Sequence, residues 1–254
     1  FMQKILFLAF LFIASSVQAS DLEREKRLKE QIFDAILDGN AEILSADGHQ
    51  FLSIYTEADE SEGAVIVMHG RGFHPDWADA INPLRVGLVS YGWNTLSIQL
   101  PVLEKTAKYY DYVPTFDEAT PRIDAAIDFL KQQGNKKIII VAHSCGAHMA
   151  MQYVRNKGEG RFDAYVGIGM GATDYQQPML EPFPLDSMKK PILDIYGEDD
   201  YPAVQRLAGI RAQQMQGEGN IFSKQIVVPG ANHYFTDKGE PLVKVIATWL
   251  ENLK

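Results

Sequence analysis

Residues 137–146 read KIIIVAHSCG, and this stretch decides the fold. The apolar run KIIIVA predicts a buried strand, and the pattern from Gly146 to Asn156 is helical. Ser144 therefore lies at a sharp strand-to-helix turn. Such a turn needs small residues two positions before and after the serine, and Ala142 and Gly146 occupy them. The turn is typical of a nucleophilic serine, and the alternative is a serine that only caps a helix.

Short apolar runs alternate with helical patterns on both sides of this turn. Alternation of this kind predicts βαβ units, because a parallel strand pair needs a crossover helix. We predict an α/β fold, with a mostly parallel sheet of about eight strands and helices on both faces. The expected strands are 42–45, 50–55, 64–68, 94–99, 137–142, 164–170, 192–196 and 224–228, and the expected helices are 21–38, 119–132, 146–156, 202–214 and 240–253.

A nucleophilic serine needs a general base, and the base needs a carboxylate that orients it. On a fold of this kind the three residues follow one another as serine, acid and histidine. Two histidines follow Ser144 in the sequence. His148 lies one helical turn further on, and we expect it to point away from the serine as a structural residue. His233 follows the last predicted strand, which is where the base is expected.

The acid is expected between these two histidines. The predicted strand 192–196 runs into the acidic turn Gly197-Glu198-Asp199-Asp200. We predict that Asp200 orients the histidine, with Asp199 as the second choice and Asp174 as a weaker candidate. The alternative is that this turn is a solvated loop or caps the helix that follows it.

Backbone N–H groups are expected to stabilise the oxyanion of the reaction. The N–H of Cys145 begins the helix after Ser144, and His69-Gly70-Arg71-Gly72 follows the predicted strand 64–68. We predict Arg71 as the second donor, with Gly72 as the alternative. The Arg71 side chain either binds an acidic substrate or pairs with a surface carboxylate. The thiol of Cys145 is expected to be a small buried apolar group.

Composition excludes several classes of protein. The chain has 254 residues, 24 Lys and Arg against 33 Asp and Glu, and a net charge of −9. We therefore expect no nucleic-acid partner. Its one cysteine cannot form a disulfide within the chain. His69 and His74 do not have a typical zinc spacing, so we expect neither a metal nor another cofactor.

The N-terminal residues have the pattern of a signal peptide. Lys4 precedes an apolar run from Ile5 to Ile13, and Val17-Gln18-Ala19 fits a cleavage site. The run is too short to span a bilayer. We predict a signal peptide over residues 1–19, export to the periplasm or secretion, and no stable membrane span after cleavage. Residues 20–254 are predicted to form a single domain.

Two long segments, 101–120 and 171–190, follow predicted strands. In an open α/β sheet such loops form the ligand crevice, and the alternative is a plain surface excursion. The first contains Tyr109, Tyr110 and Tyr112. These rings either line an acyl or aromatic pocket or pack on the surface.

Taken together, the motifs resemble those of the α/β-hydrolase superfamily. The residues that carry the resemblance are His69-Gly70 and the ranges 142–146, 197–200 and 230–233. The ranges 72–77 and 92–101 also resemble an uncharacterised bacterial family of exported hydrolase-like proteins. Ala142 departs from the glycine that is usual at its position.

This resemblance implies a serine hydrolase that cleaves a carboxylic ester, thioester or amide of a small molecule. The reaction would pass through an acyl-enzyme intermediate on Ser144. The alternative is a non-catalytic binding protein on a hydrolase scaffold, because a fold alone does not imply activity. Reaction of Ser144 with a fluorophosphonate would distinguish the two.

Overall fold

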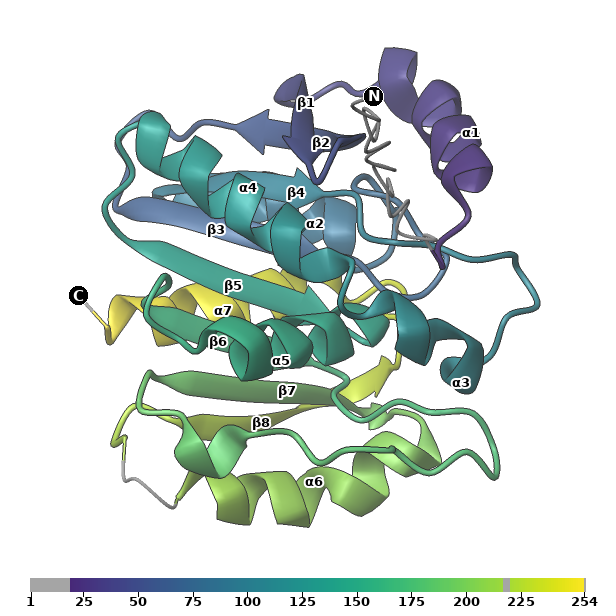
Figure 1. Cartoon of the computed structure of the whole chain (residues 1–254). Coiled ribbons are helices and arrows are strands. Elements are labelled where there is room, and N and C mark those ends of the chain that lie inside the picture. Colours follow the sequence, from purple (N-terminus) through teal and green to yellow (C-terminus); the bar gives the residue numbers. More distant parts are fainter. Residues whose placement is uncertain (1–18, 217–219, 254) are drawn as a thin grey trace, which may run out of the picture.

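The computed structural model describes residues 19–216 and 220–253. The predicted signal peptide lies outside these ranges, except for Ala19 at its end. Two antiparallel strands at one edge and a run of parallel strands make up the sheet, and helices pack on both of its faces (Figure 1).

Within the described ranges, eight strands form one sheet. In chain order they are β1 (Asn40–Ala46), β2 (His49–Thr56), β3 (Gly63–Met68), β4 (Trp93–Ile98), β5 (Ile138–His143), β6 (Ala164–Ile168), β7 (Ile192–Asp199) and β8 (Lys224–Asn232). Their spatial order is β1-β2-β4-β3-β5-β6-β7-β8. Neighbours from β4 to β8 are parallel, whereas β2 is antiparallel to both β1 and β4. The predicted mostly parallel sheet is confirmed.

The helices are α1 (Leu22–Ile32), α2 (Ile81–Gly87), α3 (Tyr109–Tyr112), α4 (Ala119–Gln132), α5 (Cys145–Lys157), α6 (Pro202–Met215) and α7 (Gly239–Glu251). Side chains alternate between the two faces along a strand. Ile66 of β3 therefore lies in one core with residues of α4 and α5, and Val65 and Val67 lie in another with residues of α2 and α7. Among the described residues, no helix has the length and apolar content that crossing a membrane requires.

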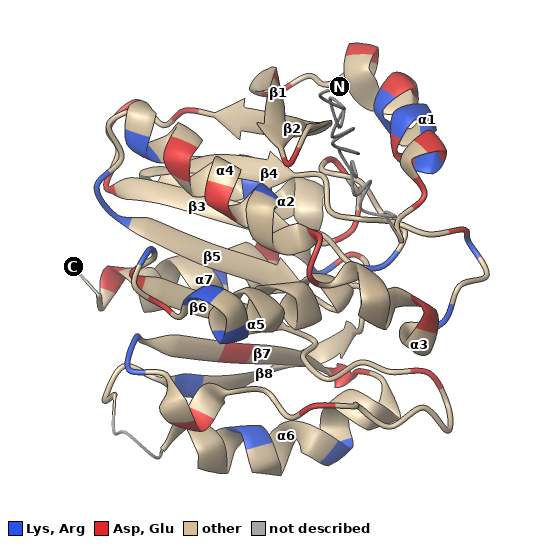
Figure 2. Cartoon of the chain, in the orientation of Figure 1, with Lys and Arg blue, Asp and Glu red and all other residues tan. Residues whose placement is uncertain are grey.

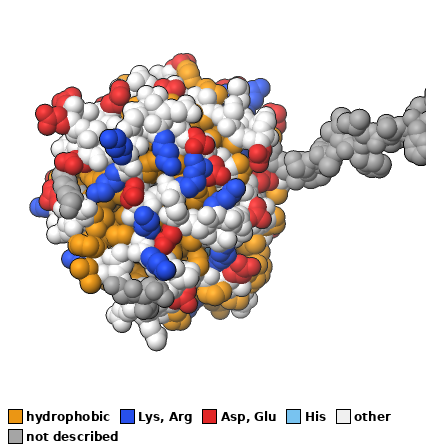
Figure 3. Space-filling model, turned by 60° about the vertical axis from the view of Figure 1, so that its left-hand side comes forward, with side chains coloured by type: hydrophobic (Ala, Val, Ile, Leu, Met, Phe, Trp, Pro, Cys, Tyr) orange, Lys and Arg blue, Asp and Glu red, His pale blue; other side chains and the backbone are white. Residues whose placement is uncertain are grey.

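Charged residues lie mainly on the helices and loops around the sheet (Figure 2). Basic and acidic side chains are interspersed in the view that brings the amino ends of the parallel strands forward (Figure 3). That face is a mixed-charge surface, and the candidate site described below lies at the opposite, carboxyl ends of the strands.

The predicted helix 21–38 is too long. Helix α1 ends at Ile32, and one turn of 3-10 helix follows before the chain becomes extended at Ile36. Leu37, which the predicted helix would have included, is 92% exposed. The chain must turn into β1 here, and Gly39 has φ +81 with the backbone of Tyr55 against it.

Two short helices, α2 and α3, were not predicted. Both lie in connections that follow strands, α2 after β3 and α3 after β4. Seven and four residues are too few to show a helical period, and Pro83 lies within α2. Helices this short are stabilised by contacts with the rest of the molecule, which the sequence pattern does not reveal.

Helix α1 is held to the body by a buried ion pair. Arg122 of α4 donates from Nη2 to Glu25 Oε1 at 2.9 Å and from Nη1 to Glu25 Oε2 at 3.0 Å. It also donates to the carbonyl of Gln99 at 3.1 Å. Glu25 is 4% exposed and Arg122 is 2% exposed. The pair therefore joins α1 to α4 and to the end of β4.

We expect Glu25→Ala to lower the free energy of unfolding by about 3 kcal/mol, because it leaves a buried guanidinium without its counter-charge. Urea denaturation measures this loss. The control is Glu23→Ala, an exposed position on the same helix, for which a change within about 0.5 kcal/mol is expected. Equal losses in both variants would show that the pair contributes nothing specific.

Candidate functional site

The turn that contains Ser144 lies at the carboxyl end of β5, in the middle of the sheet. Ser144 has φ 54 and ψ −116, a region that residues with a side chain rarely adopt. Gly146 allows the turn to approach β3, because a Cβ there would lie 2.6 Å from the carbonyl oxygen of His69 and 2.9 Å from that of Met68. The sharp strand-to-helix turn is therefore observed. Ala142, two residues before Ser144, is fully buried.

We expect Gly146→Ala to lower the free energy of unfolding by about 2 kcal/mol, because the added methyl group overlaps backbone that cannot move away easily. Gly209→Ala is the matched control, since a Cβ at this helical glycine of α6 meets nothing within 4 Å. It is expected to stabilise the protein by about 0.5 kcal/mol. Thermal or urea denaturation of the two variants compares them. A Gly146→Ala variant as stable as the wild type would refute the packing argument.

Ser144, His233 and Asp200 form a continuous chain of hydrogen bonds. The Ser144 hydroxyl donates to His233 Nε2 at 2.7 Å, and His233 Nδ1–H donates to Asp200 Oδ1 at 2.6 Å. All three residues are buried. Ser144 lies after β5, Asp200 after β7 and His233 after β8, so the carboxyl ends of three strands bring together residues that are far apart in the sequence.

The structure places Asp200, and neither Asp199 nor Asp174, beside His233. Asp200 Oδ1 also accepts from the N–H of Tyr201 at 2.7 Å, and Oδ2 accepts from the N–H of Gly197 at 3.2 Å. Asp199 is exposed and pairs with Asn232 in the ladder between β7 and β8. These contacts hold the Asp200 carboxylate in one orientation.

The loop after β3 is anchored by His69. Its Nδ1–H donates to the carbonyl of Gly70 at 2.8 Å, and its Nε2 accepts from the N–H of Leu100 at 2.9 Å. Burial lowers the pKa of His69 to about 3, so the ring is neutral at neutral pH. Both ring nitrogens are used within the protein, and His69 therefore fixes the loop that carries Arg71.

The Arg71 side chain pairs with Asp174. Its Nη1 lies 2.5 Å from Asp174 Oδ2, and its Nη2 lies 3.3 Å from Oδ1. Oδ2 also accepts from the N–H of Tyr109 at 2.6 Å. Partial burial opposes the charged carboxylate, but its hydrogen bonds to Arg71 and Tyr109 hold the pKa of Asp174 below the usual value. One carboxylate thus joins the loops that follow β3, β4 and β6.

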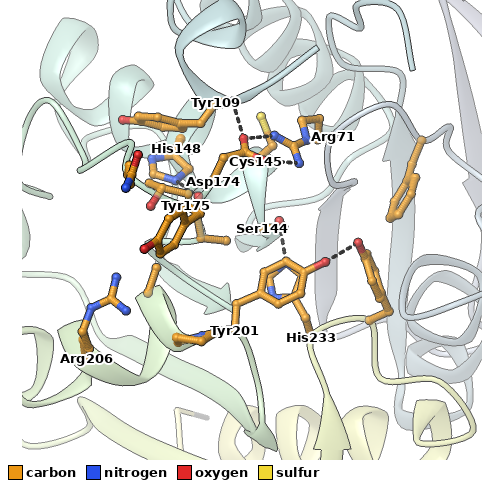
Figure 4. Close-up of a pocket in the computed structure, with 17 residues that line it drawn as sticks. Arg71, Tyr109, Ser144, Cys145, His148, Asp174, Tyr175, Tyr201, Arg206 and His233 are labelled. Atoms are coloured by element: carbon orange, nitrogen blue, oxygen red, sulfur yellow. Dashed lines mark hydrogen bonds and ion pairs between the residues drawn. The ribbon is translucent and has the colours of Figure 1, made fainter. Parts of the chain in front are cut away.

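An open pocket of about 580 Å³ lies over Ser144. Figure 4 shows residues from several loops around it. Its walls are mainly aromatic and polar, and none of the described residues in the lining is Leu, Ile, Val or Met. The lining residues are Arg71, Phe73, Tyr109, Ser144, Cys145, His148, Ala172, Thr173, Asp174, Tyr175, Gln176, Tyr201, Pro202, Ala203, Arg206, His233 and Tyr234.

The expectation that His148 points away from the serine is wrong. His148 lines the pocket, and its Nε2–H donates to the carbonyl of Ala172 at 3.0 Å. Burial lowers the pKa of this imidazole to about 4. Residues four apart lie on the same face of a helix, so the spacing from Ser144 already favours this placement. His148 is neutral at neutral pH and supports the segment after β6.

The three tyrosines of the segment 101–120 have different environments. Tyr109 lines the pocket. Tyr112 is buried, and its hydroxyl accepts from the N–H of Leu103 at 2.9 Å. Tyr110 lies at the surface. Of these three tyrosines, only Tyr109 lines the pocket, as one of the two interpretations expected for the group.

Cys145 is buried in the core beneath the turn. Burial raises the pKa of its thiol to about 12, so the sulfur stays protonated at neutral pH. The reactive form of cysteine is the thiolate, so a protonated, buried thiol is unreactive. This environment fits the expected role of Cys145 as a small buried apolar group.

Sequence reasoning missed Tyr201 and Tyr234. The Tyr201 ring stacks on the His233 imidazole, with ring centroids 4.2 Å apart and an angle of 18° between the planes. The hydroxyl groups of Tyr201 and Tyr234 are 2.5 Å apart. Each tyrosine directly follows a residue of the hydrogen-bonded chain, and this adjacency was the signal that could have found them.

Comparison with solved structures defines the class of fold. A dienelactone hydrolase from Anabaena variabilis is 20% identical, with a TM-score of 0.62, and the match covers 84% of this chain and 96% of that one. Est1E from Butyrivibrio proteoclasticus with bound ferulic acid is 15% identical, with a TM-score of 0.67 and coverage of 84% and 98%. A serine hydrolase without a lid from Xanthomonas campestris is 14% identical, with a TM-score of 0.63 and coverage of 86% and 96%. The chain therefore has the α/β-hydrolase fold.

Within that fold, the sequence matches one family over residues 13–121 and 114–252. The chain belongs to this family, which is described as "Protein of unknown function (DUF3530)". A search of curated proteins finds no matching relative. The predicted α/β-hydrolase fold is thus confirmed.

Proposed function

We propose that this protein is a serine hydrolase that cleaves a carboxylic ester of a small molecule. Ser144 is the nucleophile, His233 the general base and Asp200 the residue that orients the base. The observation that carries the proposal is the pair of short hydrogen bonds from Ser144 through His233 to Asp200 at the floor of an open pocket. Structural similarity to esterases at low identity is compatible with it.

In the proposed reaction, Ser144 Oγ attacks the ester carbonyl while His233 Nε2 takes the hydroxyl proton. The tetrahedral intermediate collapses to an acyl-serine, and His233 returns the proton to the leaving alcohol. Water then attacks the acyl-serine with His233 as the base, which releases the acid and restores Ser144. Asp200 keeps Nδ1 protonated, so that Nε2 has a free lone pair for the serine proton.

The backbone N–H groups of Cys145 and Arg71 are the proposed donors to the oxyanion. Cys145 is the first residue of α5, where N–H groups lack partners within the helix and the helix dipole favours negative charge. The loop of Arg71 is held on one side by His69 and on the other by Asp174. A loop held in this way can present its N–H without reorganisation during the reaction.

A panel of para-nitrophenyl esters of rising acyl length, with para-nitrophenyl ferulate as an aromatic member, tests the proposal. We expect hydrolysis of the short and aromatic esters and slower release from long aliphatic ones, because the pocket lining is aromatic and polar. Failure to hydrolyse any ester, together with no reaction of Ser144 with a fluorophosphonate, would favour a non-catalytic binding protein instead.

We also propose that residues 20–254 form a single domain that is exported to the periplasm or secreted. The support is the charged, apolar and small-residue pattern of the first 19 residues. N-terminal sequencing of the protein from an exporting bacterial host tests this proposal. An exported chain that begins at Ser20 would support the proposal. A chain that stays in the cytoplasm with residues 1–19 still attached would contradict it.

A further inference from the structure

Three side chains with a full charge line the pocket, namely Arg71, Asp174 and Arg206. Arg71 and Asp174 form an ion pair with each other and largely neutralise one another. The side chain of Arg206, on α6, makes no hydrogen bond or ion pair with any residue that the structure describes. Figure 4 shows the two guanidinium groups on opposite sides of Ser144, and no dashed line reaches Arg206. Among the described residues that line the pocket, Arg206 therefore carries the one positive charge that no carboxylate pairs with.

The positive charge of Arg206 is opposite in sign to the net charge of the chain. The chain as a whole carries a net charge of −9, so its average field repels an anionic substrate. Among the described residues that line the pocket, Asp174 is the only carboxylate, and it is paired with Arg71. An uncompensated arginine at such a place can form two parallel hydrogen bonds to a carboxylate.

We propose that the ester substrate carries a carboxylate away from the scissile bond, and that Arg206 binds this carboxylate. The inference rests on the proposed serine hydrolase and names the class of its substrate. With Ser144 engaged at the ester carbonyl, the carboxylate lies toward α6 and the opposite side of the substrate lies toward Arg71. The walls between these ends suit a compact, partly aromatic molecule, because Tyr109, Tyr175 and Tyr201 line the same pocket.

Two matched pairs of esters test this proposal, because the carboxylate could belong to the acyl part or to the alcohol part. The first pair is para-nitrophenyl hydrogen glutarate and para-nitrophenyl pentanoate, which have acyl chains of equal length. The second is para-acetoxybenzoate and para-acetoxybenzamide. We expect Arg206→Gln to lower kcat/KM about tenfold more for the anionic member of at least one pair than for its neutral partner.

Arg27→Gln is the matched control, because Arg27 is an exposed arginine on α1 and does not line the pocket. The same loss of one positive charge there is expected to leave every ratio unchanged. Added salt is expected to reduce the preference for the anionic ester in the wild type, as it screens an exposed charge pair. Arg206→Lys is expected to keep part of the preference, because it keeps the charge without the planar fork.

The outcomes separate this inference from the function on which it rests. If Ser144 is labelled and the neutral esters are hydrolysed, but Arg206→Gln changes neither ratio, then Arg206 is an ordinary solvated arginine and the inference is wrong. The same conclusion follows if the variant slows neutral and anionic esters equally. If the wild type hydrolyses none of the four esters and Ser144 is not labelled, the proposed hydrolase is itself wrong.

Discussion

Replacing Ser144 by alanine is expected to lower kcat for ester hydrolysis by a factor on the order of 10⁶, with little change in the free energy of unfolding. The activity is lost because no other described side chain at the pocket floor combines a hydroxyl with a hydrogen bond to His233. The fold is kept because the variant removes one oxygen and leaves the backbone turn as it is. Initial rates with the best ester of the panel and urea denaturation measure the two effects.

Ser187→Ala is the control for this variant, because Ser187 is an exposed serine outside the pocket. It is expected to keep wild-type kcat. Ser144→Ala protein that is folded and retains wild-type turnover would remove Ser144 from the mechanism. A Ser144→Ala variant that unfolds would instead show that the hydroxyl has a structural role that the contacts do not indicate.

Asp200→Asn is expected to lower kcat by about 10⁴-fold, because an asparagine amide can donate to His233 Nδ1 and stabilise the wrong tautomer. In that tautomer Nε2 carries the proton and cannot accept the one from Ser144. The side chain keeps its volume, and its carbonyl, at the position of Oδ2, can still accept from the N–H of Gly197. Steady-state kinetics and circular dichroism check activity and fold together.

Asp199→Asn is a matched control for the second prediction, one residue away on the same turn. Asp199 is exposed. Among the described residues, the carboxylate that His233 Nδ1 bonds is that of Asp200 and not that of Asp199. It is expected to keep kcat near that of the wild type. Loss of activity in Asp199→Asn with retention in Asp200→Asn would reverse the assignment of the acid.

The choice between these two aspartates shows how far the sequence could go. The order serine, acid, histidine and the strand before each of them were readable from the alternation of apolar runs. The sequence ranked Asp200 before Asp199 but could not exclude Asp199, because the two residues share one turn. The selection comes from an irregularity in the pairing of β7 and β8 between Gly197 and Asp199, after which Asp200 lies beside His233.

Contacts between segments far apart in the chain could not be predicted from the sequence for a similar reason. Arg71 and Asp174 are 103 residues apart, and each alone could pair with many partners on an acidic chain. The short helices α2 and α3 lack the length that reveals a period. The placement of His148 was different, because the spacing of four from Ser144 contained the answer and helix geometry would have corrected the prediction.

The most direct measurement of the central claim is the mass of the protein after treatment with a fluorophosphonate, followed by peptide mapping. Such probes react with a serine whose hydroxyl is activated by a neighbouring base. We predict one adduct per chain, located on Ser144, and no adduct in Ser144→Ala. Intact, folded protein that remains unmodified, or an adduct on a different residue, would contradict the claim that Ser144 is an activated nucleophile.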